Sequence, residues 1–341
     1  MSVKISVFGS GAWGTAIALL LRDNGCGVTL WSKFDAEAER ICATRENPLL
    51  VGIKLPEEIS ITSDIGAAAH DAGAVVIAVP SFAVRDTAGE LKGKLSEDCV
   101  SICMSKGIEK GTSCLFSEIL KDTLGSTAQI ATVSGPTHAE EVARGLPSAC
   151  VAASDDIKVA ERVQDILMND YFRVYTSTDV IGVELGAALK NVVALSAGVC
   201  AGLGFGDNTQ AMLMTRGLAE IAELCVKLGG RKETLAGLTG LGDLIVTCLS
   251  RHSRNRRAGE LIGKGFSAQD AMNEVGAVVE GYYAAKAAYE LSKSAGVDMP
   301  ICSEAYKVLY EQKQPVTAIK ELMSRDRKSE TGSGEERWVT N

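Results

Sequence analysis

Two hydrophobic patterns divide the chain near residue 179. Before that point, short apolar runs of strand length alternate with helical segments, and the runs cover residues 3–8, 28–31, 74–79, 99–104 and 129–133. Beyond it the strand signals fade, and helical periodicity covers residues 181–201, 208–228, 254–263, 267–274, 279–295 and 302–312. Alternating strands and helices are typical of a doubly wound, mostly parallel α/β sheet. We therefore expect an α/β domain over residues 1–178, an all-α domain over 179–324, and a polar, mobile tail over 325–341.

A glycine-rich segment directly follows the first predicted strand. Residues 9–14 are GSGAWG, and they open a helix that we expect to stop at Asn24 and Gly25. A strand, this motif and a helix within about 30 residues are the signature of a Rossmann-type dinucleotide-binding unit. In that unit the glycines allow a tight turn, close approach of a pyrophosphate and close helix packing, and the helix N-terminus binds the diphosphate. The predicted cofactor contacts here are Gly9, Gly11, Ala12, Trp13 and Gly14.

The end of the second strand bears on the choice of nicotinamide cofactor. NAD sites of this type normally place Asp or Glu there, to bind the ribose 2′-hydroxyl. Here Trp31 is followed by Ser32 and Lys33, which would leave no carboxylate to repel a 2′-phosphate. We therefore expect NADP(H) to be favoured and NAD(H) to be possible, unless Lys33 is only a solvated surface lysine.

Lys190 is the only charged residue between positions 185 and 206. A helix that is apolar on all faces is buried, and a buried ammonium group is usually paired, lowered in pKa, or both. Such a lysine is either an acid/base catalyst or a structural ion-pair partner of a hidden carboxylate. The stretch is long enough to span a membrane, but Lys190, Asn191 and its glycines argue against membrane insertion.

Polar segments at predicted strand ends supply further candidates. Ligands collect at the carboxyl ends of parallel strands, which indicates Lys106 and residues 134–137. Thr137 with Glu140 also fits a capping box, so a purely structural role for Thr137 stays open. His138 is either an acid/base group or a packing residue.

Asp243 and a basic cluster are the candidates in the second half. Asp243 follows a glycine-rich turn and is either a helix cap or the partner of a buried lysine. Residues 251–257 are RHSRNRR, where Ser253 or Asn255 can cap the next helix. A helix N-terminus favours an anion, and arginine binds phosphate oxygens bidentately. The alternative is a solvated basic face.

Composition limits the remaining functions. The net charge of −8 argues against a general nucleic-acid binder. Three histidines provide little for a histidine triad or metal site, and the ten cysteines include no C-x-x-C pair, so no metal is expected. Free cysteines in apolar runs are typical of a reducing compartment. A dinucleotide site, a buried lysine and a phosphate anchor together indicate hydride transfer to or from a small phosphorylated ketone or alcohol.

Eight segments in this order and spacing resemble the bacterial NAD(P)-dependent glycerol-3-phosphate dehydrogenases, over about residues 3–323. They are residues 9–14 (GSGAWG), 105–109 (SKGIE), 134–137 (SGPT), 182–186 (GVELG), 190–192 (KNV), 240–244 (GLGDL), 253–257 (SRNRR) and 278–281 (VVEG).

The resemblance implies a reaction and a setting. The reaction interconverts sn-glycerol 3-phosphate and dihydroxyacetone phosphate with NAD(P)(H), and it supplies glycerol 3-phosphate for phospholipid synthesis. The implied enzyme is cytoplasmic, a homodimer, and specific for a small phosphorylated molecule rather than nucleic acid.

The resemblance also implies residue roles. Lys190 is the implied proton donor and acceptor, with Asp243 and Lys106 beside it in catalysis. His138 departs from the family, which usually has Phe there, and this puts the packing of its loop in question. Implied substrate contacts are Lys106, Gly135, Thr137, Lys190, Asn191, Asp243, Ser253, Arg254 and Asn255. Implied cofactor contacts beyond the glycine-rich segment are Lys33, Lys106, Ala139, Arg254, Val278 and Glu280.

Two alternatives stay open at this point. Related two-domain dehydrogenases of β-hydroxyacids or of 6-phosphogluconate share the plan and a helix lysine, but their substrates are carboxylates. A non-catalytic NADP-sensing protein would need neither Lys190, Lys106 nor Asp243.

Overall fold

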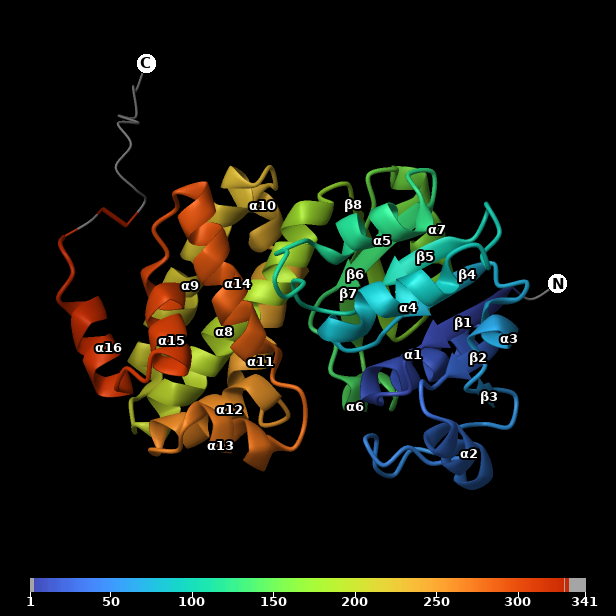
Figure 1. Cartoon of the computed structure of the whole chain (residues 1–341), viewed down its shortest axis with the longest axis horizontal. Helices are drawn as coiled ribbons and strands as arrows, with labels where there is room; N and C mark the ends of the chain where they lie inside the picture. The colour runs from blue at the N-terminus through green and yellow to red at the C-terminus, as the bar shows by residue number, and fades with distance from the viewer. Residues whose placement is uncertain (1–2, 328, 331–341) are drawn as a thin grey trace, which may run out of the picture.

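The computed structural model describes residues 3–327 and 329–330, and most of the tail predicted to be mobile lies outside these residues. A sheet covered by helices forms one part, and a helical part lies beside it (Figure 1). The predicted fold class, a mostly parallel α/β sheet followed by helices, is confirmed.

The sheet has eight strands in the order β3-β2-β1-β4-β5-β6-β7-β8. Strands β1 to β6 are parallel, β7 runs antiparallel to β6, and β8 is parallel to β7. The central strands β4 and β5 are buried along their whole length, as expected for apolar runs covered on both faces. The strands are β1 Lys4–Phe8, β2 Gly27–Trp31, β3 Ser60–Thr62, β4 Ala74–Ile77, β5 Val100–Cys103, β6 Gln129–Ser134, β7 Ser148–Ala153 and β8 Phe172–Ser177.

Helices on both faces of the sheet bury its alternating side chains. Val7 and Val76 belong to the core on one face, whereas Phe8 and Ile77 belong to the core on the other. The helix after the glycine-rich segment ends where expected, with Asn24 as its C-cap. The helices of this part are α1 Ala12–Asp23, α2 Asp35–Thr44, α3 Ile65–Ala69, α4 Val84–Leu91, α5 Phe116–Leu124, α6 Ala139–Val142 and α7 Ile157–Leu167.

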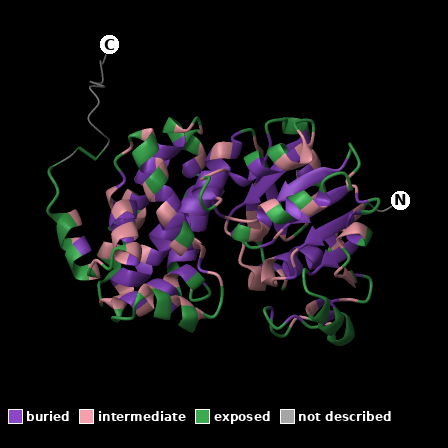
Figure 2. Cartoon of the chain, in the orientation of Figure 1, coloured by how far each residue is buried: buried purple, intermediate pink, exposed green. Residues whose placement is uncertain are grey.

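Helix α8 is the central element of the helical part. It is buried along most of its length (Figure 2), and 89% of its most apolar 18-residue window is buried inside the protein. Its length and composition would be sufficient to cross a bilayer, but this burial identifies it as a core helix. The helices are α8 Val180–Gly202, α9 Asp207–Lys227, α10 Lys232–Leu235, α11 Asp243–Leu249, α12 Arg254–Gly263, α13 Ala268–Val275, α14 Glu280–Ala295, α15 Pro300–Tyr310 and α16 Pro315–Met323, with a π-helical turn at Leu238–Gly242.

Glycines bring the backbones of α8 and α12 into direct contact. A Cβ atom added to Gly198 would lie 2.0 Å from the carbonyl oxygen of Arg256, and one added to Gly259 would lie 1.9 Å from that of Leu195. No side chain larger than hydrogen fits at either position. This crossing fixes the start of α12, with its basic cluster, relative to Lys190 on α8.

Candidate active site

The glycine-rich loop packs as a dinucleotide-binding turn does. Gly9 has φ +120°, and a Cβ atom there would lie 2.6 Å from the carbonyl oxygen of Ala78. A Cβ atom on Gly14 would lie 1.8 Å from the carbonyl oxygen of Gly9, whereas one on Gly11 would have no atom within 4 Å. The first and third glycines are therefore required by packing, and the second faces open space through which a ligand can approach the backbone.

The start of α1 fits a phosphate group. Gly11 is the N-cap and has no side chain to cap the helix, and Ala12 is its first residue. The first N–H groups of a helix lack partners within the helix and favour an anion. The indole Nε1 of Trp13 is buried without a hydrogen-bond partner. These observations fit the diphosphate of a dinucleotide at this position.

The end of β2 differs from the sequence interpretation. Ser32 is buried, and Lys33 forms an ion pair with Glu90. A carboxylate does lie at this point, because Glu37 accepts hydrogen bonds from the hydroxyls of Ser32 and Ser10. The assumption that no carboxylate is present there was wrong, since α2 begins shortly after β2 and its first turn carries Glu37 back to the strand end.

A carboxylate between two lysines forms the centre of the site. Asp243 Oδ1 lies 2.9 Å from Lys190 Nζ, and Asp243 Oδ2 lies 2.8 Å from Lys106 Nζ. Lys190 and Asp243 are buried, while Lys106 is about one-fifth exposed. Lys106 follows β5 in the α/β part, whereas Lys190 and Asp243 belong to α8 and α11. The predicted partnership of Lys190 with Asp243 is confirmed, and it includes Lys106 as well.

Two further groups complete the bonding of the lysines. Lys190 Nζ donates to the hydroxyl of Thr247 at 2.6 Å, and that hydroxyl lies 3.3 Å from Asp243 Oδ1. Lys106 Nζ donates to the carbonyl oxygen of Gly135 at 3.0 Å. Thr247 was missed by sequence reasoning, although its position one helical turn after Asp243 is a usable signal.

Burial and charge shift the pKa values of the central pair in the same downward direction. Burial lowers the pKa of Lys190 to about 8, with Asp243 opposing the change and Lys106 adding to it. Burial alone would raise the pKa of Asp243, but the two ammonium groups outweigh it and hold that pKa below its usual value. Lys190 can therefore gain and lose a proton near neutral pH beside a carboxylate that stays charged.

The loop after β6 lies against Lys106, which donates a hydrogen bond to its Gly135 carbonyl oxygen. Gly135 has φ +157°, and a Cβ atom there would lie 2.7 Å from Cys150 Cα, so this position requires glycine. The Thr137 hydroxyl donates to the Gly135 carbonyl oxygen at 3.2 Å. The capping box that Thr137 and Glu140 suggested is not formed, because His138 is the N-cap of the short helix α6, which begins at Ala139.

His138 joins this loop to the basic cluster. Its ring makes an edge contact with His252, with centroids 6.1 Å apart, and its Nε2 atom is buried without a partner. Burial lowers the pKa of His138; Lys106 and Lys190 add to this effect, and the glutamates of α6 oppose it. The His138 ring thus lies between the loop after β6 and the basic cluster, in surroundings that favour its neutral form.

The start of α12 lies beside Lys190 through a pair of asparagines. Ser253 caps α12 by accepting the N–H of Arg256 at 3.2 Å, as one of the two expected caps. Asn255 donates to Asn191 Oδ1 at 2.9 Å and accepts the N–H of Gly281 at 2.8 Å. Asn191 and Asn255 therefore tie α8, α12 and α14 together, and Gly281 is a member of this network that sequence reasoning missed.

Glu280 contacts the α/β part, and Arg254 lies near Glu280. Arg254 is exposed at the first position of α12 and lies close enough to Glu280 to influence the charge of that side chain. Glu280 accepts the N–H of Ser81, which follows β4, at 3.3 Å. Burial raises the pKa of Glu280, with the Ser81 hydrogen bonds and Arg254 opposing the shift. Val278, two residues earlier, is half-buried.

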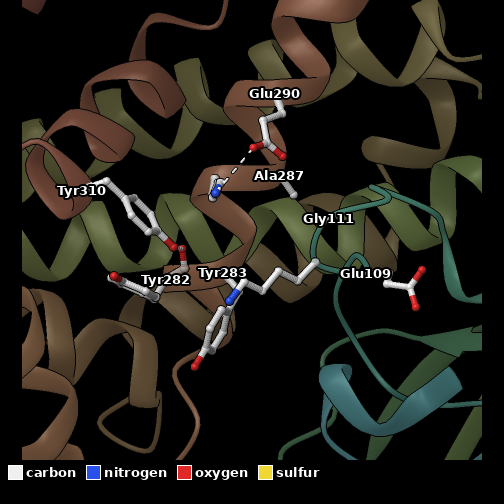
Figure 3. Close-up of a pocket in the computed structure, with 9 residues that line it drawn as sticks. Glu109, Gly111, Tyr282, Tyr283, Ala287, Glu290 and Tyr310 are labelled. Carbon is white, nitrogen blue, oxygen red and sulfur yellow. Dashed lines mark hydrogen bonds and ion pairs between the residues drawn. The ribbon is translucent and has the colours of Figure 1, made fainter. Parts of the chain in front are cut away.

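A separate cavity of about 160 Å³ lies between the loop at residues 109–111 and helices α14 and α15. Figure 3 shows Tyr282, Tyr283 and Tyr310 around it, with Glu290 paired to a neighbouring lysine. None of the residues that the sequence assigns to the site lines this cavity. The candidate active site is therefore at Lys106, Lys190 and Asp243, and not in this cavity.

The arrangement can carry out proton transfer on an anionic molecule. Lys190 supplies a proton near neutral pH, and Lys106 adds positive charge beside it. The N-terminus of α12, with Arg254 at its first position, favours an anion. The dinucleotide loop belongs to the same carboxyl edge of the sheet as Lys106, where ligands bind in such folds.

Comparisons with known proteins agree with this geometry. Two family models match: the NAD-dependent glycerol-3-phosphate dehydrogenase N-terminus over residues 4–160 and the C-terminus over residues 179–320. A glycerol-3-phosphate dehydrogenase [NAD(P)+] of Thermoanaerobacter sp. is 50% identical over 96% of this chain and 99% of the relative. One of Moorella thermoacetica is 49% identical over 98% of this chain and all of the relative. The crystal structure of glycerol-3-phosphate dehydrogenase from Coxiella burnetii superposes with a TM-score of 0.90 at 35% identity, covering 95% of this chain and 99% of that one.

Proposed function

Because the chain belongs to the NAD-dependent glycerol-3-phosphate dehydrogenase family, we propose that Lys190 moves the proton in the reaction of that family. The chain is an NAD(P)-dependent oxidoreductase that interconverts sn-glycerol 3-phosphate and dihydroxyacetone phosphate. The observation that carries the proposal is the Asp243 carboxylate, which holds buried Lys190 and partly exposed Lys106 together.

The direction of proton transfer depends on whether Lys190 is protonated or neutral. In the direction of reduction, its ammonium group donates a hydrogen bond to the ketone oxygen and then gives up a proton to that oxygen. In the reverse direction, the neutral amine accepts the proton of the alcohol. The nicotinamide cofactor, when bound, supplies or accepts the hydride at the substrate carbon. A proton donor with a pKa near the working pH is effective in both directions.

The neighbours of Lys190 position its ammonium group and stabilise the charges that change during the reaction. Asp243 orients the ammonium group and compensates its charge when Lys190 is protonated. Lys106 adds positive charge where negative charge develops on the substrate oxygen. Thr247 accepts a hydrogen bond from Lys190 Nζ, which fixes the direction of the lysine side chain.

The start of α12 holds the substrate phosphate. Arg254 and the N-terminus of α12 supply positive charge, and the Asn191–Asn255 contact fixes them relative to Lys190. Gly135 and Thr137 border the site from the α/β part, and Ser253 caps the helix that carries Arg254. Binding energy from the phosphate then places the carbonyl group against Lys190.

The proposed cofactor site extends from the glycine-rich loop to the residues around Glu280. The glycine-rich loop holds the diphosphate, while Ala139, Val278, Arg254 and Glu280 border the nicotinamide end. The choice between NAD(H) and NADP(H) rests on Ser32, Lys33 and Glu37 at the end of β2.

A cellular setting completes the proposal. The enzyme works in the cytoplasm without membrane insertion, as a homodimer, and supplies glycerol 3-phosphate for phospholipid synthesis. Ten free thiols support a reducing compartment.

An exposed apolar row at Leu241, Ile245 and Leu249 offers a surface for a second copy. Sedimentation velocity measures the dimer directly, and a monomer at micromolar concentration would contradict it.

One assay tests the proposed function. Oxidation of the reduced cofactor is followed with dihydroxyacetone phosphate and with unphosphorylated dihydroxyacetone, in wild-type enzyme and in Arg254→Ala. We expect rapid turnover only with the phosphorylated ketone. Loss of Arg254 should raise KM for that ketone by about 100-fold, because charged hydrogen bonds to phosphate are strong.

The unphosphorylated ketone is the internal control for the arginine. Arg254→Ala should leave its slow turnover nearly unchanged. Equal losses with both ketones would contradict the phosphate anchor, and no turnover with either would contradict the assigned reaction.

A further inference from the structure

The carboxylate of Glu37 joins three elements at the edge of the sheet where the dinucleotide loop lies. Glu37 is the third residue of α2. Its Oε2 atom accepts a hydrogen bond from Ser10 Oγ at 2.8 Å and another from Ser32 Oγ at 2.5 Å. Ser10 belongs to the glycine-rich loop, and Ser32 directly follows β2. A negative charge is therefore fixed between the loop and the strand end.

Ser32 is committed to this carboxylate. It is fully buried, and its hydroxyl also accepts the N–H of Phe34 at 3.4 Å. A serine hydroxyl has a single proton to donate, and Ser32 donates it to Glu37. Ser32 therefore cannot donate to a 2′-phosphate unless it releases Glu37.

Lys33 is held by a different element. Its ammonium group forms an ion pair with Glu90 on α4 and lies 6.0 Å from the ring centroid of Trp31. A 2′-phosphate would have to compete with Glu90 for this lysine. The two side chains on which a preference for NADP(H) would depend thus both have carboxylate partners.

From this placement we propose that Glu37 is a cofactor-specificity residue that accepts the ribose 2′-hydroxyl and excludes a 2′-phosphate. The inference rests on the proposed function, in that the glycine-rich loop binds a dinucleotide. In folds of this type a carboxylate at the end of the second strand binds the 2′-hydroxyl. A phosphate monoester adds about −1.5 to −2 charges near neutral pH, and Glu37 repels it. The enzyme accordingly favours NAD(H).

A purely structural Glu37 would behave differently. In that case the carboxylate only ties α2 to the loop, and its loss weakens both cofactor forms equally. The ratio of two dissociation constants on one protein cancels such general damage. Glu37→Gln keeps an oxygen that can accept from both serines and removes only the charge, so it isolates the specificity role.

The test measures binding without turnover. Isothermal titration calorimetry with ADP-ribose and with 2′-phospho-ADP-ribose compares two ligands that differ only by the phosphate and carry no nicotinamide. Full-length wild-type protein should bind ADP-ribose at least about tenfold more tightly, since like charges at a site discriminate strongly. Glu37→Gln should reduce this ratio by about tenfold or more.

Two further variants sharpen the result. Glu39→Gln removes an equal charge from an exposed position on the same helix and should leave the ratio unchanged. Glu90→Gln releases Lys33 and should strengthen binding of 2′-phospho-ADP-ribose selectively.

Each outcome has one meaning. Equal affinities or a preference for the 2′-phosphate in the wild-type protein would overturn the role of Glu37, even if Glu37→Gln failed to fold. An unchanged ratio in Glu37→Gln would overturn it as well. If neither ligand bound, the dinucleotide site of the proposed function would fall, and the inference with it. Binding without discrimination would remove only the inference.

Discussion

At the scale of single residues, the proposed proton transfer depends on how burial and charge act on Lys190. Burial removes water from its ammonium group and lowers its pKa to about 8, and Lys106 acts in the same direction. Asp243 opposes this shift at 2.9 Å and keeps the charged form accessible. The balance makes both protonation states available near neutral pH, which a reversible proton donor requires.

The pH dependence of the two reaction directions should therefore be opposite. Reduction needs protonated Lys190, so kcat/KM for dihydroxyacetone phosphate should fall as pH rises through about 8. Oxidation needs the neutral amine, so kcat/KM for glycerol 3-phosphate should rise through the same range. Initial rates in both directions between pH 6 and pH 10, about two units either side, check this. Parallel profiles would contradict the assignment.

A second buried group gives a prediction for stability. Glu220 on α9 accepts the N–H groups of Ile301 and Cys302 at the start of α15, and burial raises its pKa to about 7. The folded-state pKa thus exceeds the unfolded value of 4.5. Its contribution to stability is complete below about pH 4.5 and is lost as pH rises through about 7.

Glu220→Gln should remove that dependence while an amide oxygen still accepts the helix N–H groups. The free energy of unfolding of the wild type, relative to this variant, should fall by on the order of 2 kcal/mol between pH 5 and pH 8. Urea unfolding at both pH values measures the difference. A constant difference would show that Glu220 does not titrate in this range.

At the scale of elements, the crossing of α8 and α12 sets the position of the helix start that we propose as the phosphate anchor. Gly198 and Gly259 allow backbone contact, and the Asn191–Asn255 hydrogen bond fixes the register of the two helices. The start of α12 thereby lies beside the segment of α8 that carries Lys190 and Asn191. The position of the proposed anion site is thus a consequence of small residues where two buried helix segments cross.

Gly259→Ala should disturb this crossing. Its Cβ atom would lie 1.9 Å from the carbonyl oxygen of Leu195, so the helices must separate, and we expect a loss of at least about 2 kcal/mol of stability. Gly89→Ala on α4 is the matched control, because it is exposed with no atom within 4 Å of the new Cβ. Better helix propensity should stabilise that variant by up to about 1 kcal/mol.

Urea unfolding of both glycine variants compares the two effects, and KM for dihydroxyacetone phosphate reports the shift of Arg254. We expect opposite signs for the two changes in stability. Similar changes in both variants would show that the close crossing has no energetic role.

The elements that the sequence predicted well are those whose pattern is set by burial. The glycine-rich loop, the apolar strands β4 and β5, and the long helix α8 all follow from it. Strands β3, β7 and β8 were missed: β3 has only three residues, β7 is rich in small residues, and β8 is not a continuous apolar run, because its side chains alternate between buried and exposed. The π-helical turn before α11 was missed because its glycines suggest a loop, and α11 itself, with seven residues, was not among the predicted helices.

At the scale of the whole molecule, the site forms where the α/β part and the helical part meet. The sequence indicated a carboxylate for Lys190, but not that Asp243 would also bind Lys106, which is 137 positions away. Glu37 was not foreseen because its carboxylate reaches the end of β2 from a helix. Such contacts between distant segments depend on the packing of whole elements, which local patterns do not contain.

The arrangement of the two parts is shared with solved structures that have little sequence identity to this chain. A ketopantoate reductase and a D-mandelate dehydrogenase have the same fold, with TM-scores of 0.60 and 0.63 at 17% and 14% identity. The fold supplies a dinucleotide loop facing a helical part. The phosphorylated substrate of this chain follows instead from its membership of the glycerol-3-phosphate dehydrogenase family.

The most direct test of the account is the rate of hydride transfer from NADH to dihydroxyacetone phosphate in Lys190→Met, measured in a single turnover. Methionine fits the buried helix, and Lys227→Met on an exposed face of α9 is the surface control. We expect the rate to fall by about 1,000-fold, with cofactor binding and thermal unfolding close to those of the wild type. A rate near that of the wild type would contradict the assignment of Lys190 as the proton donor.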